Sequence, residues 1–242
     1  ISDSEADHLG KMAGLDTLDL SNDDPNQQLN LNGAVKKRVI SNSISNQGVN
    51  KLVGCKALRS LDLSYNGLDG SGLNEFTKIE GLEEIYVRGT RWSDLGVARL
   101  ATMPTLRVID LRDTRASDRS MEDLADLPLT DAGLQDLTRL RTLQVLDLSS
   151  TNVSCVRVRD MKNFSQLEHL HLAGTHVTIS SFYVLGSIKS LRFLNLLDNL
   201  PEVSTTSVPP LKAELPACMI IASEPRPQFT YYGLGGAPPL FI

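Results

Sequence analysis

A short apolar pattern recurs along most of the chain at a spacing of 24 residues. In its clearest copy Leu58, Leu61 and Leu63 are apolar, and the polar Asn66 follows three positions later. Because Leu61 and Leu63 are two positions apart, their side chains lie on one face of a strand. We expect one strand in each of six well-formed copies, which begin at Leu58, Leu82, Leu106, Leu143, Leu167 and Leu191.

A second apolar rhythm follows each strand. Val97, Leu100 and Met103 recur every three residues, as on one face of a helix or a 3₁₀ turn. Ser93 and Asp94 stand just ahead, where a hydroxyl and a carboxylate stabilise the free amides of a helix start. Neither half can bury its apolar side alone, so consecutive units must stack.

The repeated unit resembles the leucine-rich repeat family, whose motif has the form L-x-x-L-x-L-x-x-N. The stretch from Thr90 to Val97 is similar to the helical subclass of many cytoplasmic repeat proteins, including the substrate-recognition halves of F-box proteins. The resemblance covers about residues 9–199. It implies an α/β fold, a right-handed leucine-rich repeat solenoid (horseshoe) with a concave parallel β-sheet and convex helices.

Threonine replaces the family's asparagine in four copies. The affected positions are Thr90, Thr114, Thr151 and Thr175. The family's asparagine bonds to turn backbone inside the coil, and a hydroxyl can do the same with a shorter reach. We therefore expect a tighter turn at these positions.

The repeats divide the chain into three parts. Residues 1–14 are expected to form an N-terminal capping helix, because Ser2 and Glu5 have the spacing of a capping box. Residues 15–200 hold about eight repeats, irregular at 20–39 and 115–142. Two of the eight copies are degenerate, and they are marked by Leu15, Leu18 and Leu20 and by Ala34, Val39 and Asn42. Since 19 residues replace 24 between Leu20 and Val39, we expect a distorted or incomplete coil there.

The second irregular interval has a longer step, 37 residues from Leu106 to Leu143. Two full periods would need a further strand. Either residues 115–142 form an expanded convex loop, or a strand-bearing segment is missing between Pro128 and Leu129, which is the explanation that we favour.

The last part, residues 201–242, holds eight of the eleven prolines. Because proline lacks an amide donor, Pro209-Pro210 and Pro238-Pro239 argue against further helix and against sheet pairing, so we expect the repeat pattern to stop after Leu200. The run Ala217–Ala222 is nevertheless too apolar for a solvated linker. We expect a Pro-rich C-terminal cap over the last coil, and the alternative is an arm that binds a partner.

Strand positions that point away from the buried leucines form columns on the concave face. Neighbouring strands lie about 4.8 Å apart, so equivalent residues of successive copies are side by side. The candidate binding residues in these columns are Asp62, Glu84, Tyr86, Arg88, Asp110, Arg112, Asp147, His169, His171 and Phe193. Tyrosine and arginine often anchor interfaces, so we expect Tyr86, Arg88, Asp110 and Arg112 to form a binding patch. The alternative is that these residues only keep the face soluble.

His169 and His171 are the one metal-like feature of the sequence. They are two positions apart on a strand and face the same way, with Asp147 next to His171 in its column. They occupy variable positions of the repeat, however, so we expect no metal and no cofactor. Trp92 and Cys55 fall on apolar positions of the repeat and are expected in the core.

No catalytic pattern accompanies these residues. The sequence has no glycine-rich phosphate loop after a strand, no G-x-S-x-G and no H-E-x-x-H. We expect a non-enzymatic scaffold or recognition module that binds a protein partner through the concave sheet. The alternatives are a structural subunit of a large assembly and the substrate-recognition part of an F-box-like ubiquitin ligase.

Composition and charge narrow the class of partner. The chain has 24 basic and 29 acidic residues, and a net charge of −5 argues against nucleic acid. No apolar stretch is long enough to span a membrane, and no signal segment is visible at the start. Three scattered cysteines form neither a disulfide framework nor a zinc site, which favours a cytoplasmic (intracellular) protein. We expect it to be monomeric in isolation.

Overall fold

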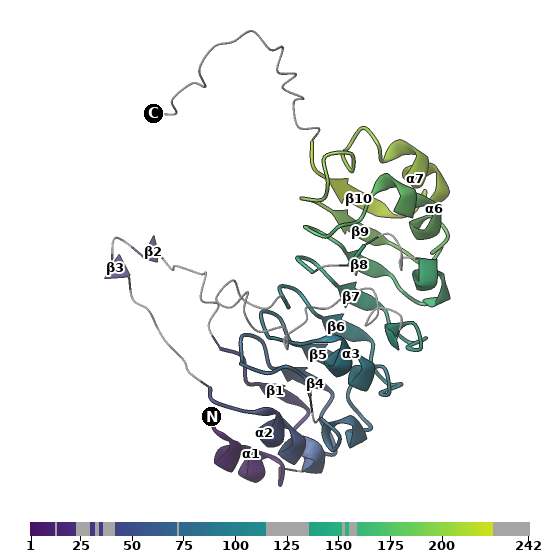
Figure 1. The fold of residues 1–242 in the computed structure, drawn as a ribbon. Helices are drawn as coiled ribbons and strands as arrows, with labels where there is room; N and C mark the ends of the chain where they lie inside the picture. Colours follow the sequence, from purple (N-terminus) through teal and green to yellow (C-terminus); the bar gives the residue numbers. More distant parts are fainter. Residues whose placement is uncertain are drawn as a thin grey trace.

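Eight short strands form one open parallel sheet. The computed structural model describes residues 1–12, 14–22, 30–31, 34–35, 42–71, 73–114, 136–151, 153–154 and 159–224. In sheet order the strands are β1 (Thr17–Asp19), β4 (Ser60–Asp62), β5 (Glu84–Tyr86), β6 (Val108–Asp110), β7 (Val145–Asp147), β8 (His169–His171), β9 (Phe193–Leu196) and β10 (Met219–Ala222). Figure 1 shows them following one another along the inner side of an arc. The predicted α/β horseshoe is therefore confirmed.

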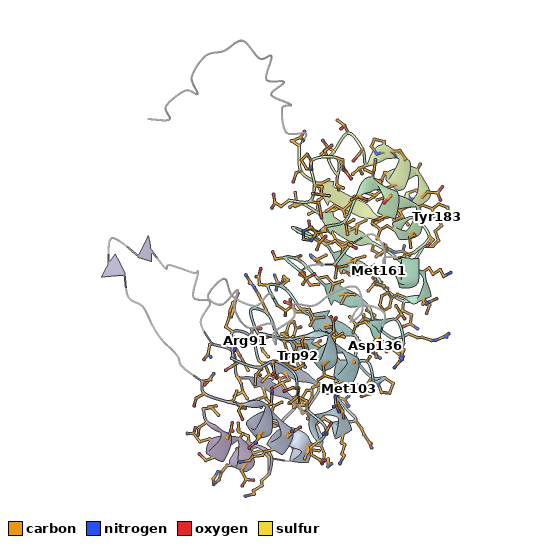
Figure 2. The ribbon with its side chains drawn as sticks, in the orientation of Figure 1. Arg91, Trp92, Met103, Asp136, Met161 and Tyr183 are labelled. Carbon is orange, nitrogen blue, oxygen red and sulfur yellow. The ribbon has the colours of Figure 1, made fainter. Side chains whose placement is uncertain are left out.

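The helical segments include α1 at the N-terminal end of the arc, and the others follow its outer side (Figure 1). They are α1 (Asp3–Leu9), α2 (Asn46–Asn50), η1 (Lys51–Gly54), η2 (Phe76–Lys78), α3 (Asp94–Leu100), η3 (Arg159–Asn163), η4 (Ile179–Ser181), α6 (Phe182–Leu185) and α7 (Pro209–Glu214). Between the two layers runs a continuous apolar core in which Trp92 and Cys55 are fully buried, as predicted. The convex face is clearest at Tyr183, which Figure 2 shows on the outer side and which is 89% exposed.

A ladder of polar side chains holds the turn after each strand. Asn66 donates from Nδ2 to the Leu63 carbonyl of its own coil at 2.9 Å and to the Leu20 carbonyl of the preceding coil at 2.8 Å. Thr114, by comparison, donates only to the Leu111 carbonyl of its own coil, at 2.8 Å, among the bonds that the described residues show. Thr90, Thr151 and Thr175 likewise donate to a carbonyl of their own coil, which is one half of the asparagine's role. Thr175 also donates to the Asn199 side-chain oxygen of the next coil at 2.9 Å.

The chain forms one coil near its start, where the sequence predicted two degenerate repeats. β4 pairs directly with β1, with Leu61 beside Leu18, so no strand of the main sheet lies between them. Asn42 donates to the Leu20 and Ser21 carbonyls at 2.9 and 3.0 Å, which is the ladder role that Asn66 has after Leu63. The coil that begins with β1 therefore resumes at Asn42, and residues 23–41 are an insertion within it. Within the insertion, β2 (Asn30–Leu31) and β3 (Ala34–Val35) form an antiparallel pair.

β6 and β7 are also direct neighbours, with Ile109 beside Leu146. The parallel ladder is therefore unbroken across the long step between them. The Pro128–Leu129 junction, where a missing segment was predicted, lies outside the described residues, as do positions 115–135.

The repeat pattern does not stop at Leu200, contrary to the prediction. Pro209 and Pro210 open α7, where the missing amide donors have no intrahelical partner in any case. β10 then extends the sheet by one strand, with Met219 beside Phe193. The prediction was wrong because it treated Pro209 and Pro210 as breaking the helical pattern, whereas these two residues begin a helix.

The other end of the arc is covered by α1, which lies over α2 and η1. The Ser2 amide donates to the Glu5 carboxylate at 2.8 Å, and the Lys51 ammonium donates to the Asp3 carbonyl at 2.8 Å. The Ser45 amide donates to the Asp3 carboxylate at 2.7 Å. The Ser2–Glu5 bond caps α1 itself, and the Lys51 and Ser45 bonds hold α1 against the first coil.

Candidate functional site

The concave columns predicted from the sequence are present. Asp62, Tyr86, Asp110, Asp147 and His171 are register partners on successive strands. Glu84 starts the same strand as Tyr86, and the starts of β8 and β9 place His169 beside Phe193. Arg88 and Arg112 follow their strands by two positions.

Three of the aspartates in this column close turns. The Asp62 carboxylate accepts the Ser64 amide at 2.8 Å, and the Asp147 carboxylate accepts the Ser149 amide at 2.9 Å. Asp110 accepts the amide of Arg112 in the same way, at 3.0 Å. This is the Asx turn that Asp and Asn favour. Tyr86 and His171 occupy the same column without this local role, so the turn does not explain their presence.

Arg112 joins two carboxylates of neighbouring coils. Its guanidinium donates to Asp110 at 3.0 Å and lies 3.2 Å from a carboxylate oxygen of Asp147. The hydrogen bonds to Asp110 raise the pKa of Arg112, so it keeps its charge. Burial, together with the charge of Asp110, raises the pKa of Asp147. The His171 Nδ1 atom lies 3.8 Å from the Asp147 carboxylate, so this polar network crosses three strands.

Tyr86 is held by its neighbour Glu84. The phenol donates to the Glu84 carboxylate at 3.2 Å, and the Ser60 hydroxyl donates to the same oxygen at 2.9 Å. Burial, and then the charge of Glu84, raises the pKa of Tyr86 to about 12. The side chain is therefore a neutral hydrogen-bonding group at physiological pH.

Tyr65 is a wall of the site that the sequence analysis missed. Its backbone has a φ of 58°, and the guanidinium carbon of Arg88 lies 5.4 Å from its ring centre. Arg88 also donates to the Asp113 carboxylate at 3.2 Å. Gly89 makes room, since a Cβ atom at this position would stand 2.4 Å from the Tyr65 ring. The sequence did contain a signal for this contact. Gly89 lies one repeat (24 residues) after Tyr65, and Arg88 directly precedes it.

These residues enclose a hollow of about 180 Å³ on the concave face. Its lining consists of Ser21, Asn22, Asp62, Ser64, Tyr65, Tyr86, Arg88, Asp110 and Arg112. All four residues of the predicted patch therefore line one depression. Asn22 and Tyr65 join them because the turns after β1 and β4 rise beside it.

The remaining predicted residues lie toward the C-terminal coils. The Phe193 ring is centred 6.0 Å from that of His169 and 5.1 Å from that of His171. No group of three His, Cys, Asp or Glu side chains that could hold a metal ion occurs in the part of the chain that the structure describes. Cys55 donates from Sγ to the Leu9 carbonyl at 3.1 Å, and burial raises the pKa of its thiol. Cys155 lies outside the described residues.

One strand per coil, a helical layer behind the sheet and an asparagine-threonine ladder define the leucine-rich repeat fold, and the chain has this fold. A sequence model of the family described as Leucine Rich Repeat matches residues 57–79, the coil that begins with β4. The solved structure of internalin C2 from Listeria monocytogenes is similar in fold, with a TM-score of 0.56 and 18% identity over 78% of this chain and 71% of that chain. No curated protein sequence matches the chain. None of the helices that the structure describes has the length and apolar character needed to cross a membrane.

Proposed function

We propose that this chain is a protein-binding module whose concave face contacts a protein partner at the hollow formed by Tyr86, Arg88, Asp110 and Arg112. The observation that carries the proposal is the convergence of these four residues, from the neighbouring coils of β5 and β6, on one depression. Tyrosine and arginine are the side chains that most often dominate binding energy. Leucine-rich repeat proteins are generally interaction modules without enzymatic activity, and the fold of this chain therefore supports the same proposal.

The site is also organised before any partner arrives. Arg112 is fixed by Asp110 and Asp147, Tyr86 by Glu84, and Arg88 by Asp113. Ordering side chains on binding costs about 0.5–1.5 kcal/mol for each flexible group, so prior ordering favours affinity. The turn-closing role of the aspartates supports a binding role in preference to paired acid and base catalysis.

The test is quantitative affinity capture from the source cells with three forms of the full chain. We choose Tyr86→Ala/Arg88→Ala as the site variant, because loss of Arg112 would leave two carboxylates without their cation. Tyr183→Ala on the convex face is the matched control. Proteins that bind the wild type and the Tyr183→Ala variant but are lost at least tenfold from the site variant support the proposal. Equal capture by all three forms contradicts it.

We further propose that the module acts as a monomer in a reducing, cytoplasmic compartment. Cys55 and Cys218 are buried free thiols in the core, where the repeat needs small apolar side chains. Light scattering of the purified chain tests the oligomeric state, and a stable dimer at micromolar concentration would contradict it.

A further inference from the structure

The concave face has two chemically different ends. At the N-terminal end, Asp19 and Asp62 are register partners, and Glu84 lies on the next strand. Like charges directly opposite each other on neighbouring strands destabilise a sheet. Among the described residues, the nearby arginines form ion pairs with other acids: Arg112 with Asp110 and Asp147, and Arg88 with Asp113. Counted over the residues that the structure describes, this end of the sheet therefore carries more negative than positive charge.

The hollow beside these acids suits a cation. Two aromatic rings, Tyr65 and Tyr86, line it together with the Asp62 carboxylate. Two arginines, Arg88 and Arg112, also line it, and their charges are balanced by ion pairs with Asp113 and with Asp110 and Asp147. An aromatic face attracts a cation, and Tyr65 already holds the Arg88 guanidinium at 5.4 Å. Burial, and then the charges of Glu84, Asp110 and Asp62, raise the pKa of Tyr86, in keeping with three carboxylates around its phenol.

The C-terminal end is apolar. Phe193 and Met219 are register partners at the starts of β9 and β10, and Met219 is 62% exposed. Ile221 lies two positions after Met219 and shares its face of the strand. Ile220 and Ala222 point the other way and pack against the core. The face thus changes from acidic to apolar along the arc.

The two ends are a fixed distance apart. Four strand steps separate β5 from β9. At about 4.8 Å for each step, the hollow and the Phe193 position are about 19 Å apart along the sheet. An extended peptide rises about 3.3 Å per residue, so about six residues cover this distance.

We propose that the concave face binds an extended segment of a protein partner. This segment places a lysine or arginine side chain in the hollow beside Tyr86. An apolar side chain about six residues away packs against Phe193 and Met219. This inference rests on the proposed function and adds the chemistry, spacing and direction of the ligand. The basic residue lies over β4 and β5, and the apolar residue lies over β9 and β10.

The experiment selects peptides from a displayed library of random twelve-residue segments on the full chain. We expect enriched peptides to contain a basic residue and an apolar residue about six positions apart. A selected peptide is then made with the basic residue changed to glutamine, with the apolar residue changed to serine, and with the spacing shortened by three residues. Each change is expected to weaken binding about tenfold.

Charge-neutral variants of the protein test the acidic end separately. In Asp62→Asn the turn persists, because Asn195 already accepts the Leu197 amide in the same way at 3.0 Å. Asp62→Asn/Glu84→Gln is expected to abolish the preference for a basic residue and to leave the apolar preference unchanged. Met219→Ser is expected to do the reverse. Glu75→Gln, on the helical layer, is the control and should change neither.

The outcomes separate the two proposals. Enriched peptides that lack the basic and apolar pair, or no enrichment at all, would overturn this inference while leaving a folded protein as the partner of the concave face. Enrichment of acidic peptides would also overturn it. Peptides that bind the Tyr86→Ala/Arg88→Ala variant as well as the wild type would contradict the proposed function itself.

Discussion

Asn22 and Asn42 are joined directly although 19 residues lie between them in the sequence. The Asn42 amide donates to the Asn22 side-chain oxygen, and the Asn22 side chain donates to the Asn42 carbonyl at 3.2 Å. Asn22 also donates to the Tyr65 carbonyl at 3.1 Å. The two ends of the insertion therefore meet at the rim of the hollow, in the position of one continuous turn.

We predict that residues 23–41 can be deleted, with Asn22 linked to Asn42. The resulting run, Leu20-Ser21-Asn22-Asn42, matches Leu63-Ser64-Tyr65-Asn66 of the next coil. Because a shorter loop loses less entropy on closing, the free energy of unfolding should stay within about 1 kcal/mol of the wild type or rise. Urea denaturation checks this prediction. As the control, Asn42→Ala in the full chain removes ladder bonds and should cost about 1–3 kcal/mol. A deletion that unfolds the chain would show that the insertion is part of the core.

Arg112 is predicted to stabilise the fold by balancing two carboxylates. Arg112→Ala leaves Asp110 and Asp147 without their cation, and we expect a loss of about 1–3 kcal/mol at neutral pH. Asp147→Asn in the same chain keeps the turn and removes one charge, so the double variant should recover part of the loss. Chemical denaturation of the wild type, the Arg112→Ala and Asp147→Asn single variants and the double variant gives the comparison, and an additive double variant would contradict the coupling.

The same pair has a pH dependence of defined sign. Burial raises the pKa of Asp147 above its unfolded value, so the folded state binds this proton more tightly. The Asp147 carboxylate therefore lowers the stability at neutral pH, and the deficit shrinks as the pH falls through its folded pKa. We expect the penalty of Arg112→Ala to shrink in acid. A penalty that grows on acidification would refute the assigned direction.

Tyr86 is predicted to ionise late. Its pKa is about 12, raised by burial and by Glu84, whereas the unfolded chain has the ordinary value of 10. The folded state therefore holds the phenol proton more tightly, and this contribution to stability is lost as the pH rises from 10 toward 12. A titration followed by phenolate absorbance should show one tyrosine ionising near 12, and Tyr86→Phe should remove that step. An unchanged titration in the variant would assign the late step to another tyrosine.

Gly89 and Gly174 form a matched pair for testing the Tyr65 wall. Both have a positive φ, 62° and 63°, so alanine should cost each about 1 kcal/mol of stability. A Cβ atom at Gly174 has no neighbour closer than 3.5 Å, whereas one at Gly89 stands 2.4 Å from the Tyr65 ring. We expect Gly89→Ala to cost more and to weaken binding of the selected peptides, and Gly174→Ala to leave binding intact. Equal binding by both variants would exclude Tyr65 from the site.

The sequence was most informative where burial imposes a period. The positions of Leu61 and Leu63 are apolar and face the core in each well-formed repeat. Their spacing alone therefore predicted the strand, its register and the concave column that contains Tyr86. Trp92 was placed correctly for the same reason. The buried side of a repeat is determined by its neighbours, which have the same sequence pattern.

Prediction failed where the chain departs from the apolar period. Asn42 was assigned to a repeat of its own, because its bonds to the Leu20 and Ser21 carbonyls depend on two segments separated by the insertion. β10 was missed because Pro209 and Pro210 were interpreted as breaks. Tyr65 was missed because its place in the hollow depends on a positive φ and on the space that Gly89 leaves.

Site-specific photocrosslinking is the sharpest test of whether a partner binds the concave face. A photoreactive aromatic residue replaces Tyr86 in one form of the full chain and Tyr183 in another, and each form is irradiated in the source cells. We expect a covalent adduct to a partner protein from position 86 and none from position 183. Adducts from position 183 alone, or the same adducts from both positions, would contradict binding through the concave face.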